Sequence, residues 1–486
     1  PLWACAKAGY WRGGLAEALL QQLGRGGGAL MRAANGQDHG NVWWSLSVAP
    51  EEVLQAGQAE EVLDASAEAL QQMTAQLNSQ DCSNVLLACA RLQRSHAVLA
   101  HHLTACLAAQ TNASCQALAN SLYALGELRK DCGHTPQLLE LQRLAAGVLR
   151  RLNGGLGGGG GVGPGGSGGR FTPQELSNML LGCTKLGYTD AGLLQPLAIA
   201  AGQATGRMKE QELANSLYAL AVLGCNDPAY APAVLQLAAE CKWRNFTGFK
   251  PQELSNSVWA QAKMGRNSDQ GWFAAAVAVA MRPGVLEEFN AQELSNLCYG
   301  LALVRHRPGP AFLVSTAAVS GVLRSEANGQ DCANLLWSLA ILEAPSEPRL
   351  VGVLVERLEE LLPQRGGVSD QHLTTSLWAL AVMGPGVLSR HQRPVEVLLR
   401  EVVRRWDRPA AAAVNKGSSG AGRFTGAGLR QLWRVQQELE HADGCSRLVG
   451  IMAGSGDAGS KGSLLSAIRR HAASKGRAVD GRPDDR

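Results

Sequence analysis

Amide and aromatic side chains recur at fixed spacing along this chain, and together they could contact nucleic-acid bases. In the stretch QELSN, Gln174 stands four residues before Asn178, and the same pair returns in several later segments. Three residues after the Asn there is often an aromatic side chain, as at Trp259. Amides hydrogen-bond to base edges, and aromatic rings stack on bases. A segment that is repeated this often is not a single active site.

We take the Asn as register position 0 of each repeat. The nine copies have the register residues Asn41, Asn84, Asn120, Asn178, Asn215, Asn256, Asn296, Asn334 and Thr375. Position −4 is Gln in every one of them: Gln37, Gln80, Gln116, Gln174, Gln211, Gln252, Gln292, Gln330 and Gln371. Successive register residues lie 36 to 43 residues apart, except for one step of 58 that contains the glycine-rich insertion 153–170. Residues 2–10 form a truncated further copy, since Trp3 aligns with Trp259.

Each copy begins with the signals of a helix N-terminus. Thr172 at position −6 is a good N-cap, and it is followed by Pro173 at the first helical position and Glu175 at the third. In two copies Lys209 and Lys250 occupy this position, so no side-chain cap is expected there. The helix ends at a glycine, and a looser amphipathic stretch follows. Two helices per repeat predict an αα-hairpin, and the series predicts an all-α fold, an α-solenoid over residues 1–406.

The predicted first helix of each repeat has three stripes of residues. Positions −2, +2, +5 and +9 share one face and read Leu176, Leu180, Cys183 and Gly187 in one copy, which predicts a core stripe. Positions −1 and +6 are small, so another helix can approach closely. Positions −4, 0, +3 and +7 form the third stripe, which we call the polar stripe. It holds Gln, Asn, an aromatic residue or Leu, and a variable residue.

The polar stripe has a structural and a functional interpretation. Constant amides favour a structural ladder between repeats, because residues that read a sequence must differ from repeat to repeat. The residues assigned this structural role are Gln174, Gln211, Gln252, Gln292, Asn178, Asn215, Asn256, Asn296 and Asn334. Position +7 varies, as a base reader requires and as a solvated edge also allows. The RNA-binding candidates are Arg91, Lys185, Lys263, Lys209, Lys250, Arg305, Trp259, Trp337 and Trp378. The aromatic candidates are equally suited to a core, and each basic one to an ordinary charged surface.

Composition limits the other function classes. The chain has 486 residues, 46% of them hydrophobic and 5% aromatic, and a net charge of +4 that permits a polyanionic partner without requiring one. The twelve cysteines are scattered like small apolar filler residues, which favours a reducing compartment over a disulfide framework. No apolar run is long enough to span a membrane.

Enzyme and cofactor signatures are not recognisable. The insertion 153–170 follows no predicted strand and opens no helix, unlike a phosphate-binding loop. No Cys and His set has metal-ligand spacing, and no catalytic triad or carboxylate pair stands out from the repeats. We therefore expect no enzyme activity, metal or cofactor.

The repeats resemble the octotricopeptide-repeat proteins of green-algal organelles and the related leucine-rich repeats of FAST-kinase-like and RAP-domain proteins. The resemblance is carried by QELANSLYALAVLG (211–224), QDCANLLWSLAIL (330–342) and QHLTTSLWALAVMG (371–384). It implies an α-solenoid that binds single-stranded RNA and acts on transcript stability, processing or translation, with other organellar RNA-processing proteins as further partners. The implied location is the chloroplast, or alternatively the mitochondrion. No segment resembles a RAP domain, so no nuclease or kinase activity is implied.

Two function classes therefore remain open. An RNA-binding solenoid predicts that Arg91, Lys185 and Lys263 converge on one surface. The alternative is a protein-binding scaffold of the armadillo or HEAT type, which predicts a neutral or acidic groove.

The flanking segments carry further expectations. Residues 407–423 read as a linker, residues 424–448 as a degenerate closing helix with Trp433 and Leu439 buried, and residues 449–486 as a disordered tail that contains one brief helix at 463–474. The chain starts at Pro1 inside a repeat, so we expect a preceding region with a targeting peptide.

Overall fold

The computed structural model describes residues 1–55, 58–94, 96–154, 170–266, 269–343, 348–407, 424–442, 444–453 and 464–473. Every regular element within these ranges is helical, and the helices form stacked repeats, which confirms the all-α solenoid class. The chain divides into two compact units, Pro1–Cys241 (unit 1) and Lys242–Arg486 (unit 2). The predicted repeat domain, residues 1–406, includes residues of both units.

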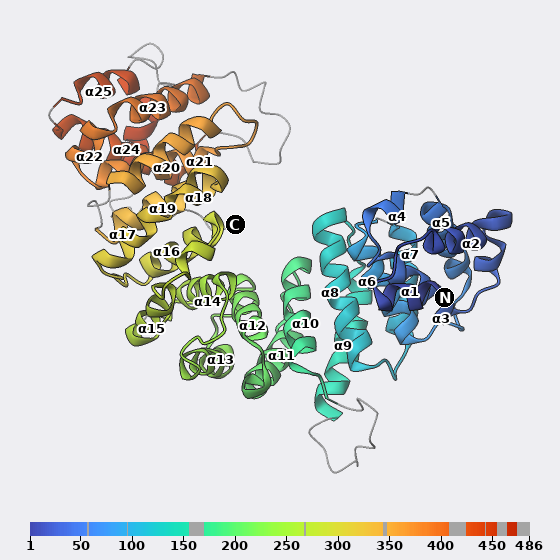
Figure 1. Ribbon diagram of the computed structural model, residues 1–486. Helices are drawn as coiled ribbons and strands as arrows, with labels where there is room; N and C mark the ends of the chain where they lie inside the picture. The colour runs from blue at the N-terminus through green and yellow to red at the C-terminus, as the bar shows by residue number, and fades with distance from the viewer. Residues whose placement is uncertain are drawn as a thin grey trace. The chain divides into compact units, whose positions relative to one another are not determined.

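Unit 1 has two layers of helices, which follow one another in chain order (Figure 1). The first helices of its repeats are α1 (Leu2–Ala8), α3 (Gly36–Leu46), α6 (Ser79–Arg91), α8 (Cys115–Cys132), α10 (Pro173–Leu186) and α12 (Glu210–Val222). The second layer contains α2 (Leu15–Arg32), α4 (Glu51–Gln55), α5 (Gln58–Gln72), α7 (Ala97–Ala109), α9 (Leu138–Gly154) and α11 (Ala191–Gln203), followed by α13 (Ala231–Trp243) at the unit boundary. Each first helix packs on the next first helix, as the series α6, α8, α10 illustrates. Short 3-10 turns at Thr205–Arg207 and Pro228–Tyr230 join some of them.

Unit 2 repeats the same arrangement. Its first helices are α14 (Pro251–Lys263), α16 (Ala291–Leu303), α19 (Gly329–Ile341), α21 (Asp370–Val382) and α24 (Gly426–His441). Its other helices are α15 (Gln270–Ala280), α17 (Pro310–Ala318), α18 (Ser320–Glu326), α20 (Pro348–Leu361), α22 (Pro385–Arg390), α23 (Gln392–Asp407), α25 (Ser446–Ala453) and α26 (Leu464–Ala473), with a 3-10 turn at Leu286–Glu288. First helices again contact one another directly, from α14 to α24.

The helix starts follow the predicted capping pattern. The Thr172 hydroxyl accepts a hydrogen bond from the Glu175 backbone N–H, while the Glu175 carboxylate accepts one from the Thr172 N–H. Half of this box survives at Lys209, whose backbone N–H donates to Glu212 at 2.8 Å, although no side chain caps the helix there. Lys250 and its third helical residue repeat that half box. The missing cap therefore leaves the helix start in place.

Position +9 is a helix C-cap and not part of the core, which corrects the predicted core stripe. Gly187 has a φ of 59°, in the left-handed region, and the next N–H, from Tyr188, donates to the carbonyl of Cys183 at 2.9 Å. This is a Schellman motif. Gln93, Arg305 and Glu343 occupy the same position with φ near 51–52°. The core stripe is therefore −2, +2 and +5, where Leu176, Leu180 and Cys183 are at most 2% exposed.

Position +4 is the small position that the sequence analysis missed. It reads Ser45, Ala88, Ala124, Gly182, Ala219, Ala260, Gly300, Ser338 and Ala379 in the nine copies. A Cβ at Gly182 would lie 2.5 Å from the carbonyl oxygen of Leu122. A Cβ at Gly126, which is at position +6 of the preceding copy, would lie 2.9 Å from the carbonyl oxygen of Gly182. Small residues here let the backbones of successive first helices touch, as close packing requires.

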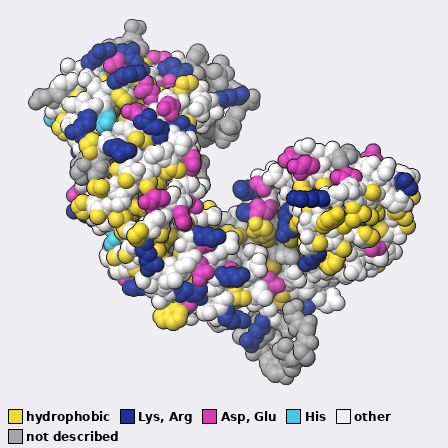
Figure 2. Space-filling view, in the orientation of Figure 1, with side chains coloured by type: hydrophobic (Ala, Val, Ile, Leu, Met, Phe, Trp, Pro, Cys, Tyr) yellow, Lys and Arg dark blue, Asp and Glu magenta, His cyan; other side chains and the backbone are white. Residues whose placement is uncertain are grey.

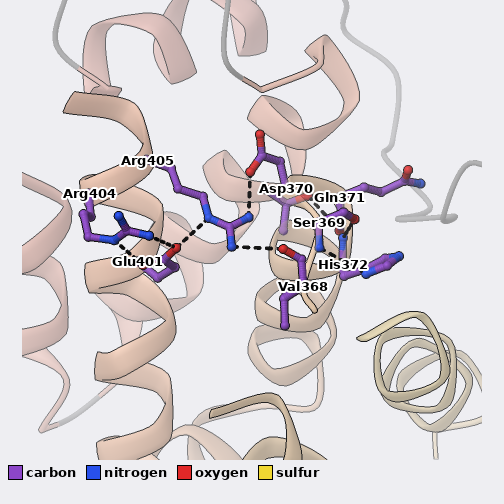
Figure 3. A network of polar contacts seen from close by, with 9 residues as sticks. Val368, Ser369, Asp370, Gln371, His372, Glu401, Arg404 and Arg405 are labelled. Atoms are coloured by element: carbon purple, nitrogen blue, oxygen red, sulfur yellow. Dashed lines mark hydrogen bonds and ion pairs between the residues drawn. The ribbon is translucent and has the colours of Figure 1, made fainter. Parts of the chain in front are cut away.

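An arginine near the end of the second helix closes several hairpins. Arg405 on α23 donates to the carbonyl of Val368 at 3.0 Å and to Asp370 Oδ1 at 2.7 Å, and Glu401 Oε1 accepts from its Nε at 2.7 Å (Figure 3). Val368 is at position −7, just before the first helix starts. Arg151 and Arg357 donate in the same way to the −7 carbonyls of Ala113 and Ala327. These arginines tie the start of a repeat to its end.

The C-terminal segments are more ordered than the sequence predicted. α24 packs on α21, and α25 packs on α23, so together they form one more hairpin instead of a single closing helix. Leu439 is 1% exposed as predicted, but Trp433 is half-buried, because it lies beside the buried face and not on it. The brief helix expected at 463–474 is present as α26, which packs on α24 with Leu464 and Ile468 fully buried.

Several predictions fall outside the described residues. These are most of the glycine-rich insertion (155–169), most of the linker (408–423) and the tail segments 454–463 and 474–486. Of the ranges named for them, 153–154 belong to α9 and 407 belongs to α23.

The twelve cysteines behave as filler residues. All have free thiols, and eleven of them are buried. Burial raises the pKa of the Cys183 thiol to about 12, so it stays protonated and unreactive. Among the described helices, none combines the length and the apolar character needed to cross a membrane.

Candidate nucleic-acid interface

The amides of the polar stripe point outward. The Gln side chains at −4 are exposed at Gln174, Gln211, Gln252 and Gln292. The register Asn residues are half-buried at Asn178, Asn215, Asn256 and Asn296, and Asn334 is 5% exposed. Within the described residues none of these amides shows a hydrogen bond to a neighbouring repeat. Their structural role stays a prediction.

A Trp–Lys–Trp cluster lies at the N-terminal end of the polar stripe in unit 1. The rings of Trp3 on α1 and Trp44 on α3 are 6.4 Å apart between centroids. The Lys7 Nζ lies 5.7 Å from the Trp3 centroid and 5.4 Å from the Trp44 centroid, within cation–π range. Trp3 is 45% exposed, so part of its ring is open to solvent.

Lys7 was not among the predicted candidates. The truncated copy has no register Asn, but aligning Trp3 with Trp259 places Lys7 at position +7. That alignment is the sequence observation from which Lys7 could have been identified as a candidate. Both +3 and +7 of this copy therefore belong to the polar stripe.

A second cluster joins α8 to α10. Lys185 Nζ forms an ion pair with Glu127 Oε1 and lies 4.7 Å from the centroid of the Tyr123 ring. The Tyr123 hydroxyl forms a hydrogen bond with the Glu127 carboxylate. Tyr123 is at +3, Glu127 at +7 of the same repeat, and Lys185 at +7 of the next. We call this the Tyr123–Glu127–Lys185 cluster.

The surroundings define the charge state of this cluster. Burial alone would raise the pKa of Glu127, but hydrogen bonds from Lys185 and Tyr123, with the lysine charge, lower it overall. The pKa of Tyr123 is raised by burial and then by its hydrogen bond to Glu127. At neutral pH the cluster therefore holds a carboxylate, which only accepts hydrogen bonds, beside a neutral phenol.

Of the three predicted converging cations, Lys185 belongs to this cluster. Arg91 at +7 of α6 is exposed, and its positive charge acts to lower the pKa of Tyr123. The third, Lys263, belongs to α14 of unit 2, where it is half-buried. The convergence of Arg91, Lys185 and Lys263 on one surface stays a prediction.

In unit 2 most of the aromatic residues of the polar stripe are core residues. Tyr299 and Trp337 are each 1% exposed, with ring centroids 5.1 Å apart, and Trp378 is 3% exposed. Trp337 and Trp378 were predicted as RNA-stacking candidates. This is corrected, because neither ring has a face open to a base. Trp259 on α14 remains half-buried.

The other basic candidates lie at helix ends, outside the polar stripe. Lys209 and Lys250 precede α12 and α14, and Arg305 follows α16 at the left-handed position +9, with all three exposed. Figure 2 shows that basic and acidic side chains alternate over the visible face of each unit. No continuous basic surface is visible there, so the charges of individual clusters matter more than a general field.

Within the ranges that the structure describes, no three His, Cys, Asp or Glu side chains are grouped to hold a metal ion.

A protein-family model described as "Tbc2 translation factor, N-terminal domain" matches residues 135–383, about half of the chain. No curated protein matches the chain significantly. The matched range includes the repeats from Asn178 to Thr375 and contains Lys185, whereas Tyr123 and Glu127 lie just before it.

Proposed function

The chain belongs to the family of the Tbc2 translation factor N-terminal domain, and we propose that it binds single-stranded RNA sequence-selectively and acts post-transcriptionally on organellar transcripts. Translation is the favoured step, because the family is described by a translation factor. The resemblance to octotricopeptide-repeat proteins supports the chloroplast, or alternatively the mitochondrion, and leaves RNA stability and processing as related outcomes. In this proposal the protein is a binding protein, not an enzyme, and it works with other RNA-processing proteins.

The polar stripe of unit 1 is the observation that supports RNA binding. Six successive first helices place +3 and +7 side chains in one row, and these include rings with a lysine within 6 Å of the ring centre at Trp3, Trp44 and Tyr123. Rings take up bases by stacking, and the cations bind the phosphates between them. If one repeat serves one base, unit 1 accounts for about six nucleotides.

Binding of a labelled single-stranded RNA of random sequence, measured by fluorescence anisotropy over a range of KCl concentrations, tests this proposal. We expect binding that weakens steeply with salt. Changing Arg91 to Gln should weaken binding of all sequences alike and reduce the salt slope by about one. The matched control is Lys130→Gln, an exposed lysine on α8 outside the polar stripe.

Crosslinking and sequencing of RNA bound to the native protein identifies the transcript. Absence of binding at low salt, together with no transcript above background, would rule out the proposal and favour a protein-binding scaffold.

A further inference from the structure

Building on the proposed RNA binding, we propose that the Tyr123–Glu127–Lys185 cluster selects one base of the bound RNA, and that this base is guanine. The proposal concerns the choice among bases at one repeat, whereas the proposed function concerns RNA binding as such.

Glu127 is an unusual residue for this row. The +7 residues from Lys7 to Val382 are basic or apolar in all the other copies: Lys7, Val48, Arg91, Lys185, Val222, Lys263, Leu303, Ile341 and Val382. An acidic group in a row that faces a polyanion repels phosphate, so it weakens general binding. A contact with the donor groups of a base offsets that repulsion.

The carboxylate still has acceptor sites available. It has about four lone-pair sites, and Lys185 and Tyr123 use at most two of them. The Glu127 side chain is 17% exposed and that of Lys185 is 21% exposed, so the cluster reaches the surface. Because Lys185 and Tyr123 both hold the carboxylate, little side-chain freedom is left to lose when a base binds.

Close contact between α8 and α10 holds the cluster together. Gly126, one residue before Glu127, packs directly against Gly182, which stands three residues before Lys185. A Cβ on either glycine would clash with the opposite helix. Arg129 adds a hydrogen bond to the carbonyl of Leu186. The separation of Glu127 and Lys185 is therefore set by backbone packing and not by the two flexible side chains alone.

Guanine is the base that fits a carboxylate best. Its Watson–Crick edge carries two adjacent donors, N1–H and the N2 amino group, which match the two oxygens of one carboxylate. Adenine, cytosine and uracil each offer a single donor group on that edge, beside acceptors that a carboxylate repels. Lys185 is placed to bind the neighbouring phosphate or a guanine acceptor, since lysine only donates.

The test is selection of preferred sequences from a random single-stranded RNA pool by the whole chain, with Glu127→Gln, Glu127→Asp and Glu68→Gln in parallel. Glu68 is an exposed acid on α5 of the same unit, so its variant controls for the loss of one charge. The preferred RNA is then compared with versions that replace one guanine at a time.

We expect the wild type to prefer guanine at one position of its selected sequence by roughly tenfold or more, the range of a bidentate contact. Glu127→Gln should remove the preference at that position alone while general affinity rises, because Lys185 loses its partner. Glu127→Asp should keep part of the preference, and Glu68→Gln all of it.

Two other results would overturn the inference. One is a Glu127→Gln variant that selects the same sequence as the wild type, and the other is loss of preference for a base other than guanine. If the wild type binds no RNA, the proposed function itself fails. Circular dichroism on every variant establishes that the helices are intact.

Discussion

The polar stripe has the same residue types in both units but different surroundings. At +3, unit 1 presents rings that are half-buried or more exposed, such as Trp3 and Trp44. At the same position in unit 2, Trp337 and Trp378 are at most 3% exposed. An aromatic residue at this repeat position is therefore partly exposed in unit 1 and buried in the later copies of unit 2, while Trp259 of unit 2 is half-buried.

The neighbouring side chains account for this difference. In unit 1 the +7 residues near the rings include Lys7 and Lys185, whose ammonium groups lie beside the aromatic faces. In unit 2 the following +7 residues are Leu303, Ile341 and Val382. The Tyr299 ring packs against Trp337, and both rings are buried. A residue's position in the repeat therefore does not by itself determine its exposure.

The largest expected effect is on stability, from Trp337→Ala. Removing a buried indole leaves a cavity, and we expect a loss of about 3–5 kcal/mol in the free energy of unfolding. Trp3→Ala should cost less than Trp337→Ala, because the Trp3 ring is already 45% exposed and buries less apolar surface. Chemical denaturation followed by circular dichroism measures both. Equal losses for the two variants would show that the two rings contribute equally to stability despite their different exposure.

Gly182→Ala tests the spacing of the first-helix layer. The added Cβ would meet the Leu122 carbonyl oxygen at 2.5 Å, and a backbone group cannot move aside, so we expect a loss of about 2–3 kcal/mol. Gly300→Ala in unit 2 should be milder, because its closest neighbour is the Val258 side chain at 2.9 Å.

Thermal unfolding of the two variants ranks them. Gly206→Ala, where no atom lies within 4 Å, is the control and should unfold like the wild type. A Gly182 variant as stable as the control would show that the helices can separate without loss.

His39 gives unit 1 a pH dependence in its core. It fills position −2, where unit 2 has the buried Leu254, and burial lowers its pKa from 6.5 to about 4. The unfolded state thus binds the proton more readily, so stability is complete above pH 6.5 and falls as the pH drops toward 4.

Comparing unfolding at pH 7 and pH 5 in wild type and His39→Leu tests this. Because of His39, the free energy of unfolding of the wild type should be about 2 kcal/mol lower at pH 5 than at pH 7. The His39→Leu variant should lack this contribution. The Ser66 hydroxyl, which contacts His39 at 2.6 Å, keeps the Trp43 indole N–H as a donor in the variant. An unchanged pH dependence would show that His39 is protonated in the folded protein.

The smallest effect is on RNA affinity. Lys7→Gln should lower it roughly two- to fivefold, the contribution of one exposed cation beside two rings. Lys263→Gln in unit 2 should have less effect if unit 1 supplies most of the contacts with bases. Anisotropy titrations at one salt concentration separate the two, and a stronger effect of Lys263→Gln would reverse the assignment of the binding surface.

The helices and their caps were predictable because they depend on neighbours in the sequence. Thr172, Pro173 and Glu175 define a helix start within four residues, and the core face of Leu176, Leu180 and Cys183 follows from the helical period. Position +9 was misread, since a wheel diagram does not show that the helix has ended and that Gly187 has a positive φ.

The candidate site was only partly predictable. Lys185 and Arg91 were found from the variation at +7, but their acidic and aromatic partners, Glu127 and Tyr123, were not assigned to the site. Their contacts join two repeats across the glycine-rich insertion, and a pattern read one repeat at a time cannot show which side chains meet.

By itself the sequence determined the repeat, the hairpin and the buried leucines, because helix periodicity and capping act over a few residues. The partial exposure of Trp3, the burial of Trp337 and the ion pair between Lys185 and Glu127 follow from the tertiary structure alone. Those outcomes depend on how the adjacent helix fills the space beside each side chain, and that space exists only once the repeats have packed together.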